Sequence, residues 1–514
     1  MSKTANSIFN IQYSITNVQM GLALVVLSFG ILSAPAAEPG RELTLADCVG
    51  LALENNLDLK IEKITRDIAR QEVAAAQGGY DPELKLSASR THEESAGESA
   101  GTAAGALEVL DTDTDRDAYD ASVGGETALG GLRYEVGTQL GDSSGTREGN
   151  PFDTSTGSAG VTLTQPLLQG FRTGGVRYQV LLARKQSAEA AVQVEAKIQD
   201  VLAQVESAWY ALIEAREGLR VQEEAVRLAT QLYEDNRRKV QIGALSSLDE
   251  KQAESQAAAA RADLSSAKQA YAEAQNQLKT LLFADHRSLR AVELTAAGGL
   301  SAEPVQVDPA ASGETALAQR PDLRQARLAL ERQGITVNYQ KNQTLPSLDL
   351  VGGYGVAASG EESQSDVFDR MGSADEPYST AGVTLTFPLG NRAAEARRAQ
   401  SLANEEKMKL QLRQLEETAL VEVENAAAAV ATGQEKVQAT REAREYAEQA
   451  LAAEQRKLAS GKSTSFVVLQ LQRDLTQARK SEIEALAGYN RQLSTLAQAE
   501  GAMLARHGVT LAAE

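Results

Sequence analysis

Cysteine, histidine and tryptophan are scarce in this chain of 514 residues. It has one cysteine, Cys48, one tryptophan and three histidines. A single cysteine excludes an internal disulfide framework and a paired-thiol metal or redox site. His92, His286 and His507 each lie in a polar stretch without a matching set of ligands, so we expect all three at the surface. The sequence therefore predicts no metal site, no cofactor and no histidine-based catalysis.

Positive charge and aromatic residues are also in short supply. The 51 lysines and arginines are outnumbered by 70 aspartates and glutamates, and the formal net charge is −19. No basic stripe is available to neutralise phosphates, which argues against nucleic acid as a partner. Aromatic residues make up only 4% of the chain, which is low for a globular enzyme of this length. The acidic residues are spaced as on solvated helix faces and form no catalytic constellation, so an enzyme is not expected.

Long apolar runs are absent except near the N-terminus. Residues 20–37 read MGLALVVLSFGILSAPAA, an apolar stretch followed by the small-x-small pattern Ala34-Pro35-Ala36. This pattern predicts a secretory signal peptide over residues 1–36. Cys48 lies too far beyond it for a lipid-anchored N-terminus, and we expect a buried helix cysteine instead. No later segment resembles a membrane-spanning helix, so a membrane segment after export would have to be a β-barrel.

An internal duplication accounts for most of the chain. The stretches AGVTLTQPLLQG and AGVTLTFPLGNR place Val161 and Val383 222 residues apart. RKVQIGALSSLDEKQAES, from Arg238, is similar to RKLASGKSTSFVVLQLQRD, from Arg456, and their glycines, Gly243 and Gly461, are 218 residues apart. We interpret the chain as one repeated unit of about 220 residues.

The domain organisation follows from this repeat. We predict a first repeat over residues 37–283, a Gly- and Pro-containing linker over 284–313, a second repeat over 314–507 and a tail over 508–514. Each repeat is expected to contain a helix, a set of strands and a long helical hairpin, in that order. The predicted helices span about 43–78 and 314–341, the strand regions about 80–166 and 346–388, and the hairpins about 175–283 and 392–507.

The strand regions alternate apolar and polar residues, which indicates sheets with two different faces. Leu84 and Leu86 alternate with Glu83, Lys85 and Ser87, for example. A soluble sandwich is one interpretation, but the secretion signal and the Gly-, Ser- and Asp-rich loops favour an outer-membrane barrel. The first repeat has additional alternating segments over 119–140. These form either an extra hairpin in the barrel wall, which we favour, or an external loop.

The helical regions are much longer than globular helices usually are. The helix predicted over 175–242 would reach roughly 100 Å at about 1.5 Å per residue. Steps of three and four residues between apolar positions, such as Leu278 and Leu281, are typical of paired coiled-coil helices.

The motifs LTLADCVGLALENNLDL, VTLTQPLLQGFRTGG and the RKxxxG turn followed by Asp249, with their second-repeat counterparts, resemble the TolC-like outer-membrane efflux family from residue 43 to about 507. The resemblance implies a trimeric outer-membrane β-barrel continued by a periplasmic α-helical coiled-coil tunnel, which exports small molecules or proteins and does no chemistry. It further implies a periplasmic adaptor protein and an inner-membrane pump of the RND or ABC type as partners. The predicted location is the outer membrane, in contact with its lipid and extending into the periplasm.

The two glycine-centred turns are the candidate functional sites. Gly243 and Gly461 are expected to end helices with a positive φ, and Ser246 or Ser247 and Ser463 to Ser465 to cap the returning helices. The resemblance implies that the turns lie at the periplasmic mouth and meet the adaptor. The residues assigned to this role are Arg238, Gly243, Leu245, Ser246, Arg456, Gly461, Lys462 and Ser463.

The resemblance also implies an acidic aperture beside the second turn, and here the sequence departs from the family pattern. Asp249 keeps the acid after the first glycine, but the aperture positions after the second fall on Val467 and Gln470. The family's basic position falls on Ser463, next to Lys462. We therefore expect no strong acidic ring and a mouth that is held by other contacts.

A second hypothesis is a structural or adhesive coiled-coil protein with a barrel anchor and no transport activity. It explains the long helices and the signal peptide. It gives no reason for two tip turns at matched offsets, which favours the export duct.

Overall fold

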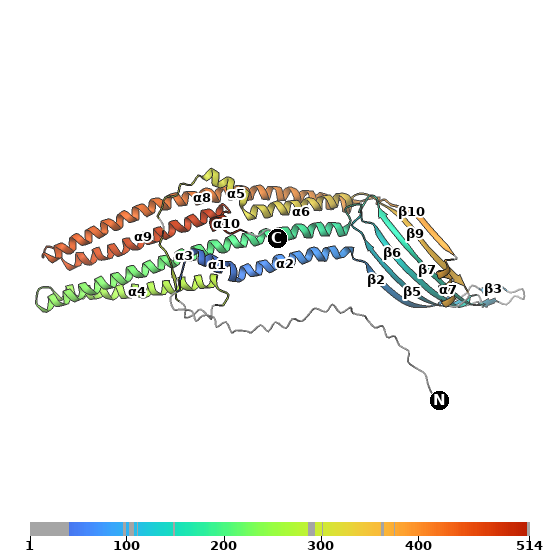
Figure 1. The fold of residues 1–514 in the computed structure, drawn as a ribbon, viewed down its shortest axis with the longest axis horizontal. Coiled ribbons are helices and arrows are strands. Elements are labelled where there is room, and N and C mark those ends of the chain that lie inside the picture. The colour runs from blue at the N-terminus through green and yellow to red at the C-terminus, as the bar shows by residue number, and fades with distance from the viewer. Residues whose placement is uncertain are drawn as a thin grey trace, which may run out of the picture.

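A computed structural model describes residues 41–95, 99–101, 107–109, 112–147, 150–285, 293–300, 302–360, 364–374 and 376–510. The predicted signal peptide, His286 and the last four residues of the predicted tail lie outside these ranges. The described part is an elongated rod with a curved sheet at one end and two helical hairpins reaching the other (Figure 1).

The two hairpins form most of the rod's length. α3 (Gly175–Gln241) and α8 (Arg392–Ala459) contain 67 and 68 residues. The returning helices are α4 (Ser247–Leu282) and α9 (Ser465–Ala499). At about 1.5 Å per residue, each outgoing helix is roughly 100 Å long. None of the described helices combines the length and apolarity needed to cross a membrane.

The shorter helix of each repeat is broken into two, whereas the sequence predicts one helix in each place. α1 (Leu45–Asn55) and α2 (Leu57–Gln77) meet at Asn56, and α5 (Pro309–Gln319) and α6 (Pro321–Gln343) meet at Arg320. Both junction residues have nearly the same conformation, with φ and ψ of −58° and 126° for Asn56 and −58° and 125° for Arg320. The Asn56 side chain accepts a bond from the Leu59 amide, and Pro321 forces the residue before it out of the helical region.

The described parts of the linker contain regular structure that the sequence does not predict. β8 (Leu294–Ala296) pairs in parallel with β1 (Arg41–Leu43), so the linker is tied to the start of the first repeat. α5 begins at Pro309, inside the predicted linker, where Asp308 caps the helix and proline occupies its first turn. Proline is favoured there because its missing amide would have no helical partner. The remaining short elements are η1 (Gly78–Tyr80), β3 (Ser99–Gly101), β4 (Leu107–Val109) and α10 (Met503–Arg506).

The main apolar core lies midway along the rod, where α1, α3, α4, β1 and β8 meet. Its buried members include Leu212, Ile213, Leu278, Leu282 and Leu294, with Trp209 at its margin. Cys48 belongs to the same core and is fully buried. The expectation of a buried helix cysteine is therefore confirmed.

Burial raises the pKa of the Cys48 thiol to about 12, with the neighbouring Asp47 carboxylate adding to the effect. Because the thiolate is the reactive form, we predict that maleimide does not label Cys48 in the folded protein at pH 7. Labelling is expected only after unfolding in guanidinium. A Ser247→Cys variant, exposed at the first tip, is the control and should label at once. Mass spectrometry after timed quenching reports both, and fast labelling of Cys48 in the folded protein would contradict the core described above.

The sheet contains six strands in the order β10-β9-β7-β6-β5-β2, and all neighbours are antiparallel. The first repeat supplies β2 (Glu83–Ser95), β5 (Thr112–Glu126), β6 (Arg133–Arg147) and β7 (Asn150–Pro166). The second supplies β9 (Ser347–Gly360) and β10 (Pro377–Thr386). Residues 119–140 therefore lie in β5 and β6 and in the turn between them, and not in a loop outside the sheet.

The two faces of the sheet differ as the alternation predicts. The register places Leu84, Val123, Val136 and Val161 in one row across four strands, and all four side chains are exposed. The next row, on the other face, begins at Lys85 and Ser122 and continues through Gly137 and Gly160. One face is therefore apolar and the other is lined by small and polar residues.

A short helix that the sequence does not predict covers the far end of the apolar face. α7 (Gln364–Ser373) lies between β9 and β10 and packs Val367 and Met371 against Ala358 and its neighbours. A Cβ at Gly157 would be 2.8 Å from both the Met371 sulfur and a Val367 methyl. Glycine at this strand position thus lets the helix approach the sheet.

Candidate functional site: the hairpin tips

The two hairpin turns lie at the end of the rod opposite the sheet (Figure 1), and they have the same backbone structure. After α3, the Gly243 amide donates to the Val240 carbonyl and the Ala244 amide to the Lys239 carbonyl. After α8, the Gly461 amide donates to Leu458 and the Lys462 amide to Lys457 in the same pattern. These paired bonds define a Schellman C-cap, which satisfies the last carbonyls of each long helix.

The glycine at each turn is required by its backbone conformation. Gly243 and Gly461 have φ values of +74° and +73°, and a Cβ at either position would meet nothing within 4 Å. A side chain therefore has room, but the left-handed conformation itself disfavours it.

We predict that Gly243→Ala destabilises the protein by about 1–2 kcal/mol, because the left-handed conformation costs that much for a residue with a Cβ. The matched control is Gly50→Ala, at an exposed position inside α1 with no atom within 4 Å of its Cβ. That change should stabilise by about 0.5–1 kcal/mol. Guanidinium unfolding followed by circular dichroism compares them, and equal stability of the two variants would refute the role of the positive φ.

The helix that follows the first tip begins with a complete capping box. The Ser246 hydroxyl accepts bonds from the Leu248 and Asp249 amides at 3.1 and 3.4 Å. In return, the Asp249 carboxylate accepts the Ser246 amide at 3.3 Å. Asp249, an aperture candidate from the sequence, therefore has a structural task at the start of α4.

The second tip lacks this box. Thr464 is the N-cap of α9, and its side chain makes no capping bond. The expected cap from Ser463 to Ser465 is thus wrong. The residue equivalent to Asp249 is Val467, which cannot accept an amide. Instead, the Ser463 hydroxyl donates to the Glu454 carboxylate at 2.5 Å. This bond and one from Lys457 hold the pKa of Glu454 below its usual value.

Asn236 joins the two tips and was not singled out from the sequence. It is fully buried on α3. Its amide nitrogen donates to the Asp249 carbonyl at 3.3 Å, and its amide oxygen accepts the Ser465 hydroxyl at 3.0 Å. Ser465 is itself 2% exposed and is the first residue of α9. One side chain of α3 therefore binds both α4 and the second hairpin, and we call this group of three residues the tip node.

An apolar cluster begins one turn from the tip node, whose Asn236 and Ser465 side chains are themselves buried. Its buried members come from all four hairpin helices: Leu232, Ala253, Leu451, Val468, Leu469 and Leu475. A hydrogen bond between buried side chains is costly to lose because the freed groups stay buried.

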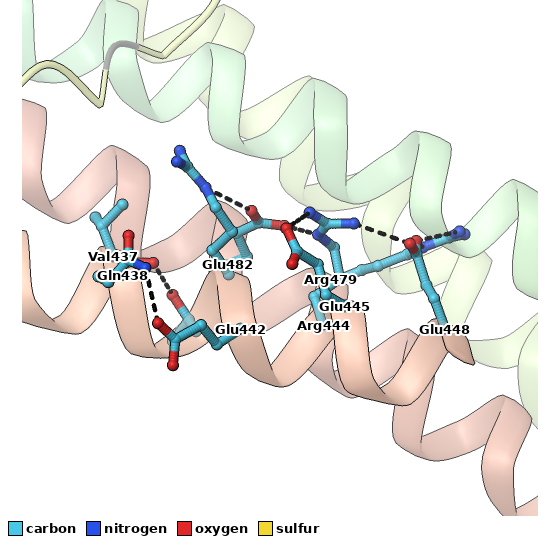
Figure 2. Close-up of polar contacts among 10 residues, drawn as sticks. Val437, Gln438, Glu442, Arg444, Glu445, Glu448, Arg479 and Glu482 are labelled. Carbon is cyan, nitrogen blue, oxygen red and sulfur yellow. Dashed lines mark hydrogen bonds and ion pairs between the residues drawn. The ribbon is translucent and has the colours of Figure 1, made fainter. Parts of the chain in front are cut away.

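Farther from the tip, ion pairs clamp α8 to α9 (Figure 2). Arg444 contacts Glu482 at 2.6 Å across the two helices, and Arg479 contacts Glu448 at 2.9 Å. Arg444 also contacts Glu448 along its own helix at 2.9 Å. The second hairpin is thus connected internally by charged pairs, whereas its contacts with the first hairpin near the tip are the uncharged tip node, the apolar cluster and a hydrogen bond from Arg473 of α9 to Gln256 of α4.

The other predicted tip residues are mostly exposed. Arg238 contacts Asp235 of its own helix at 3.2 Å, and the Arg456 guanidinium donates to the Ala452 carbonyl. Lys462, Val467 and Gln470 are exposed, and Leu245 and Asp249 are half-buried. Of the three aperture candidates, Asp249, Val467 and Gln470, the structure therefore places only Asp249 in the hydrogen-bond network of the tip node.

A signal for Asn236 is present in the sequence. Leu228, Leu232 and Asn236 follow one another at steps of four residues on α3, so the asparagine occupies a seam position that is otherwise apolar. A polar residue at such a position commonly fixes the pairing of helices.

A second buried polar group lies midway along the rod. Glu206 of α3 is fully buried and contacts Arg506 at 3.1 Å and His507 at 3.0 Å. The His507 side chain is only 9% exposed, so the expectation of a surface histidine is wrong for this residue, whereas His92 is exposed. Burial by itself raises the pKa of Glu206, but the bond from His507 and the Arg506 charge outweigh burial and lower it.

No group of histidine, cysteine or acidic residues in the described ranges is arranged to hold a metal ion.

Comparisons with known proteins agree with this architecture. Residues 48–282 and 313–502 match the family model described as outer membrane efflux protein. A search of curated protein sequences finds no significant match.

Several solved structures share the fold. CusC is 18% identical, with a TM-score of 0.67 over 89% of this chain and 92% of its own. The Campylobacter jejuni CmeC outer membrane channel is 17% identical, with a TM-score of 0.62 over 89% and 85%. The open state of the Neisseria gonorrhoeae MtrE outer membrane channel is 18% identical, with a TM-score of 0.62 over 90% and 89%.

Proposed function

Because the chain belongs to the outer membrane efflux protein family, we propose that three copies of it form the exit duct of an export system. Members of this family are outer-membrane channels and not enzymes. The duct would carry its cargo from the periplasm or cytoplasm to the outside and would catalyse no reaction.

One observation carries the proposal: a sheet with a single apolar face and a pair of matched helical tips occupy opposite ends of one rod (Figure 1). The sheet suits lipid on one side and water on the other. The tips, separated from it by helices about 100 Å long, suit contacts deep in the periplasm.

Assembly of several copies follows from the sheet's edges. β2 and β10 are the outer strands of the six-stranded sheet, and every residue of both is exposed. Unpaired backbone groups cannot remain in lipid. A further copy at each edge removes them, and three copies agree with the resemblance to the TolC-like family.

The tips are the proposed docking surface for a periplasmic adaptor, whose inner-membrane partner would be an RND or ABC pump. Leu248 and Phe466 occupy equivalent positions at the start of α4 and α9 and are 65% and 57% exposed. Ile242 is 79% exposed at the first turn. Exposed apolar groups flanked by Arg238 and Arg456 suit a partner surface of mixed apolar and acidic character.

A deletion strain tests the proposal. The strain should become sensitive to toxic compounds or lose export of a protein, and the gene should restore the phenotype. A Leu248→Glu and Phe466→Glu double variant should reach the membrane but fail to restore it. Full complementation by this variant would show that the tips do not dock the adaptor. A deletion without any transport defect would favour the structural coiled-coil alternative.

The mouth should respond weakly to multivalent cations, because Val467 and Gln470 take the places of an acidic ring. We predict that hexamminecobalt at micromolar concentration leaves single-channel conductance unchanged. Val467→Asp combined with Gln470→Asp should create a block, since three copies would bring six carboxylates together. Tight block of the unaltered channel would contradict this account of the aperture. Gln400→Asp with Asn404→Asp, at exposed positions of α8 far from the tip, controls for a general gain of negative charge.

A further inference from the structure

The two repeats contribute unequally to the sheet, and the difference lies in β5 and β6. The second repeat supplies two strands, whereas the first supplies four. The duplicated sequence motifs lie in β7 and β10, and the opening strands β2 and β9 correspond in the same way. β5 and β6 therefore form an insertion of one hairpin into the first repeat.

The inserted hairpin separates β2 from β7 along their whole length. The register pairs β2 with β5 from Glu83 to Ser95, and β6 with β7 from Arg133 to Arg147. An external loop would leave β2 and β7 to pair with each other. The hairpin also continues both faces: Tyr119 and Val123 extend the apolar face, and Ser122 and Gly137 extend the polar one.

The position of the apolar residues along the strand also shifts from one strand to the next, as the tilted strands of a barrel require. Followed through the register, Leu84 of β2 is level with Tyr354 of β9 and Ser379 of β10. The apolar residues of β10, Val383 and Leu385, lie four and six residues nearer the helices and on the same face. A lipid layer can contact both Leu84 and Leu385 only if the strands are tilted.

The size of this shift fits closure by a second copy of the chain. Pairing Leu385 of one copy with Leu84 of the next gives a shift of six residues over six strands. With about 3.3 Å per residue and about 4.8 Å between strands, the tilt is about 35°, which lies within the range of membrane barrels.

We propose that β10 of each copy pairs with β2 of the next, so that three sheets of six strands close into one barrel of 18 strands whose outlet admits bulky hydrated cargo. This rests on the trimeric duct proposed above. At the same tilt, the backbone-to-backbone diameter is about 34 Å, against about 23 Å for a barrel without the inserted hairpins.

The residues that face the lumen combine small side chains with longer polar and charged ones. On β5 and β6 they include the small Ser122, Gly137 and Gly141, and also the larger Arg116, Arg133, Glu135 and Gln139. On β9 and β10 they include Gly353, Gly355 and Thr380. The small side chains leave part of the added diameter open, and the longer polar side chains give the outlet a hydrated, charged lining.

Electron cryomicroscopy of the purified full-length protein in lipid nanodiscs tests the strand number. We expect a trimer with 18 strands. A trimer with 12 strands and the hairpins outside the wall would overturn this inference while leaving the duct intact. A different copy number would contradict the proposed function itself.

The outlet size gives a second test that needs no structure of a variant. Polyethylene glycols added to the extracellular side of channels in planar bilayers should reduce conductance up to a molecular radius about 1.5-fold larger than in a variant lacking residues 112–147. This deletion keeps β2 and β7 and leaves the residues between them as their connection. If the variant does not assemble, the exclusion limit of the unaltered channel is compared with the limit calculated for a barrel about 23 Å in diameter. A measured limit at that smaller radius would overturn the proposal.

Discussion

Asn236→Leu is expected to open the mouth of the duct. The change removes two hydrogen bonds per copy, to the Asp249 carbonyl and from the Ser465 hydroxyl, one turn from a buried apolar cluster. At about 1 kcal/mol for each bond, the balance between closed and open tips shifts by roughly 30-fold per copy. Single-channel recordings should show a state of higher conductance, and cells should become sensitive to large antibiotics.

Two serines provide a matched comparison for this prediction. Ser465 binds across the two hairpins, whereas Ser463 binds Glu454 within its own hairpin. Ser465→Ala should increase the open fraction by about fivefold, in line with the loss of one bond, and Ser463→Ala should leave it unchanged. Equal behaviour of the two variants would mean that the tip node does not hold the mouth closed.

The largest loss of stability is expected from Arg506→Ala combined with His507→Ala. These residues are the partners of the fully buried Glu206: the Arg506 guanidinium and the His507 ring lie 3.1 and 3.0 Å from the same carboxylate oxygen. Removing the partners of a buried charge typically costs about 3–5 kcal/mol. Adding Glu206→Gln should recover much of this loss because the uncompensated charge is gone. Fluorescence of Trp209, one turn along α3, reports unfolding of this region in guanidinium.

The Glu206 carboxylate also makes the stability of the folded protein depend on pH in a predictable direction. Its pKa is lower in the folded protein than its usual value, so the unfolded chain takes up the proton first as the pH falls. The stabilisation is therefore present above about pH 4.3, the ordinary glutamate value, and is lost as the pH falls through the lowered folded pKa.

Glu206→Gln should remove this part of the acid sensitivity. The exposed Asp200, which accepts a bond from Gln498 at 3.2 Å, supplies the control Asp200→Asn, with an expected effect within about 0.5 kcal/mol. An unchanged acid dependence in Glu206→Gln would show that the buried pair is not its source.

The sequence predicts the long helices, the alternating strands and the positive φ of Gly243 and Gly461 because each leaves a local pattern. Helical and strand periods are visible within one segment, and the duplication provides a second copy of every turn. The splitting of the shorter helices at Asn56 and Arg320 is harder to predict, because an apolar pattern continues through both junctions and only the capping contact and Pro321 end the helix.

Contacts between the repeats could not be predicted in this way. Asn236 and Ser465 are separated by 229 residues, and Glu206 and Arg506 by 300. His507 lies in a polar stretch of the sequence, yet the fold brings it against the buried Glu206 carboxylate. The comparison of the two tips does reveal that Val467 replaces Asp249, but the bond from Ser465 to Asn236 joins the second tip to α3 of the other repeat and leaves no local pattern.

The most direct test of a duct that closes at its tips is a reversible lock at the tip node. Asn236→Cys with Ser465→Cys replaces side chains whose amide and hydroxyl oxygens are 3.0 Å apart, and the native Cys48 is buried and does not interfere. Single-channel conductance of this variant should be low under oxidising conditions, when a disulfide joins the hairpins, and should rise several-fold on adding a reductant. A conductance that is the same in both conditions, with disulfide formation verified by mass spectrometry, would contradict the account.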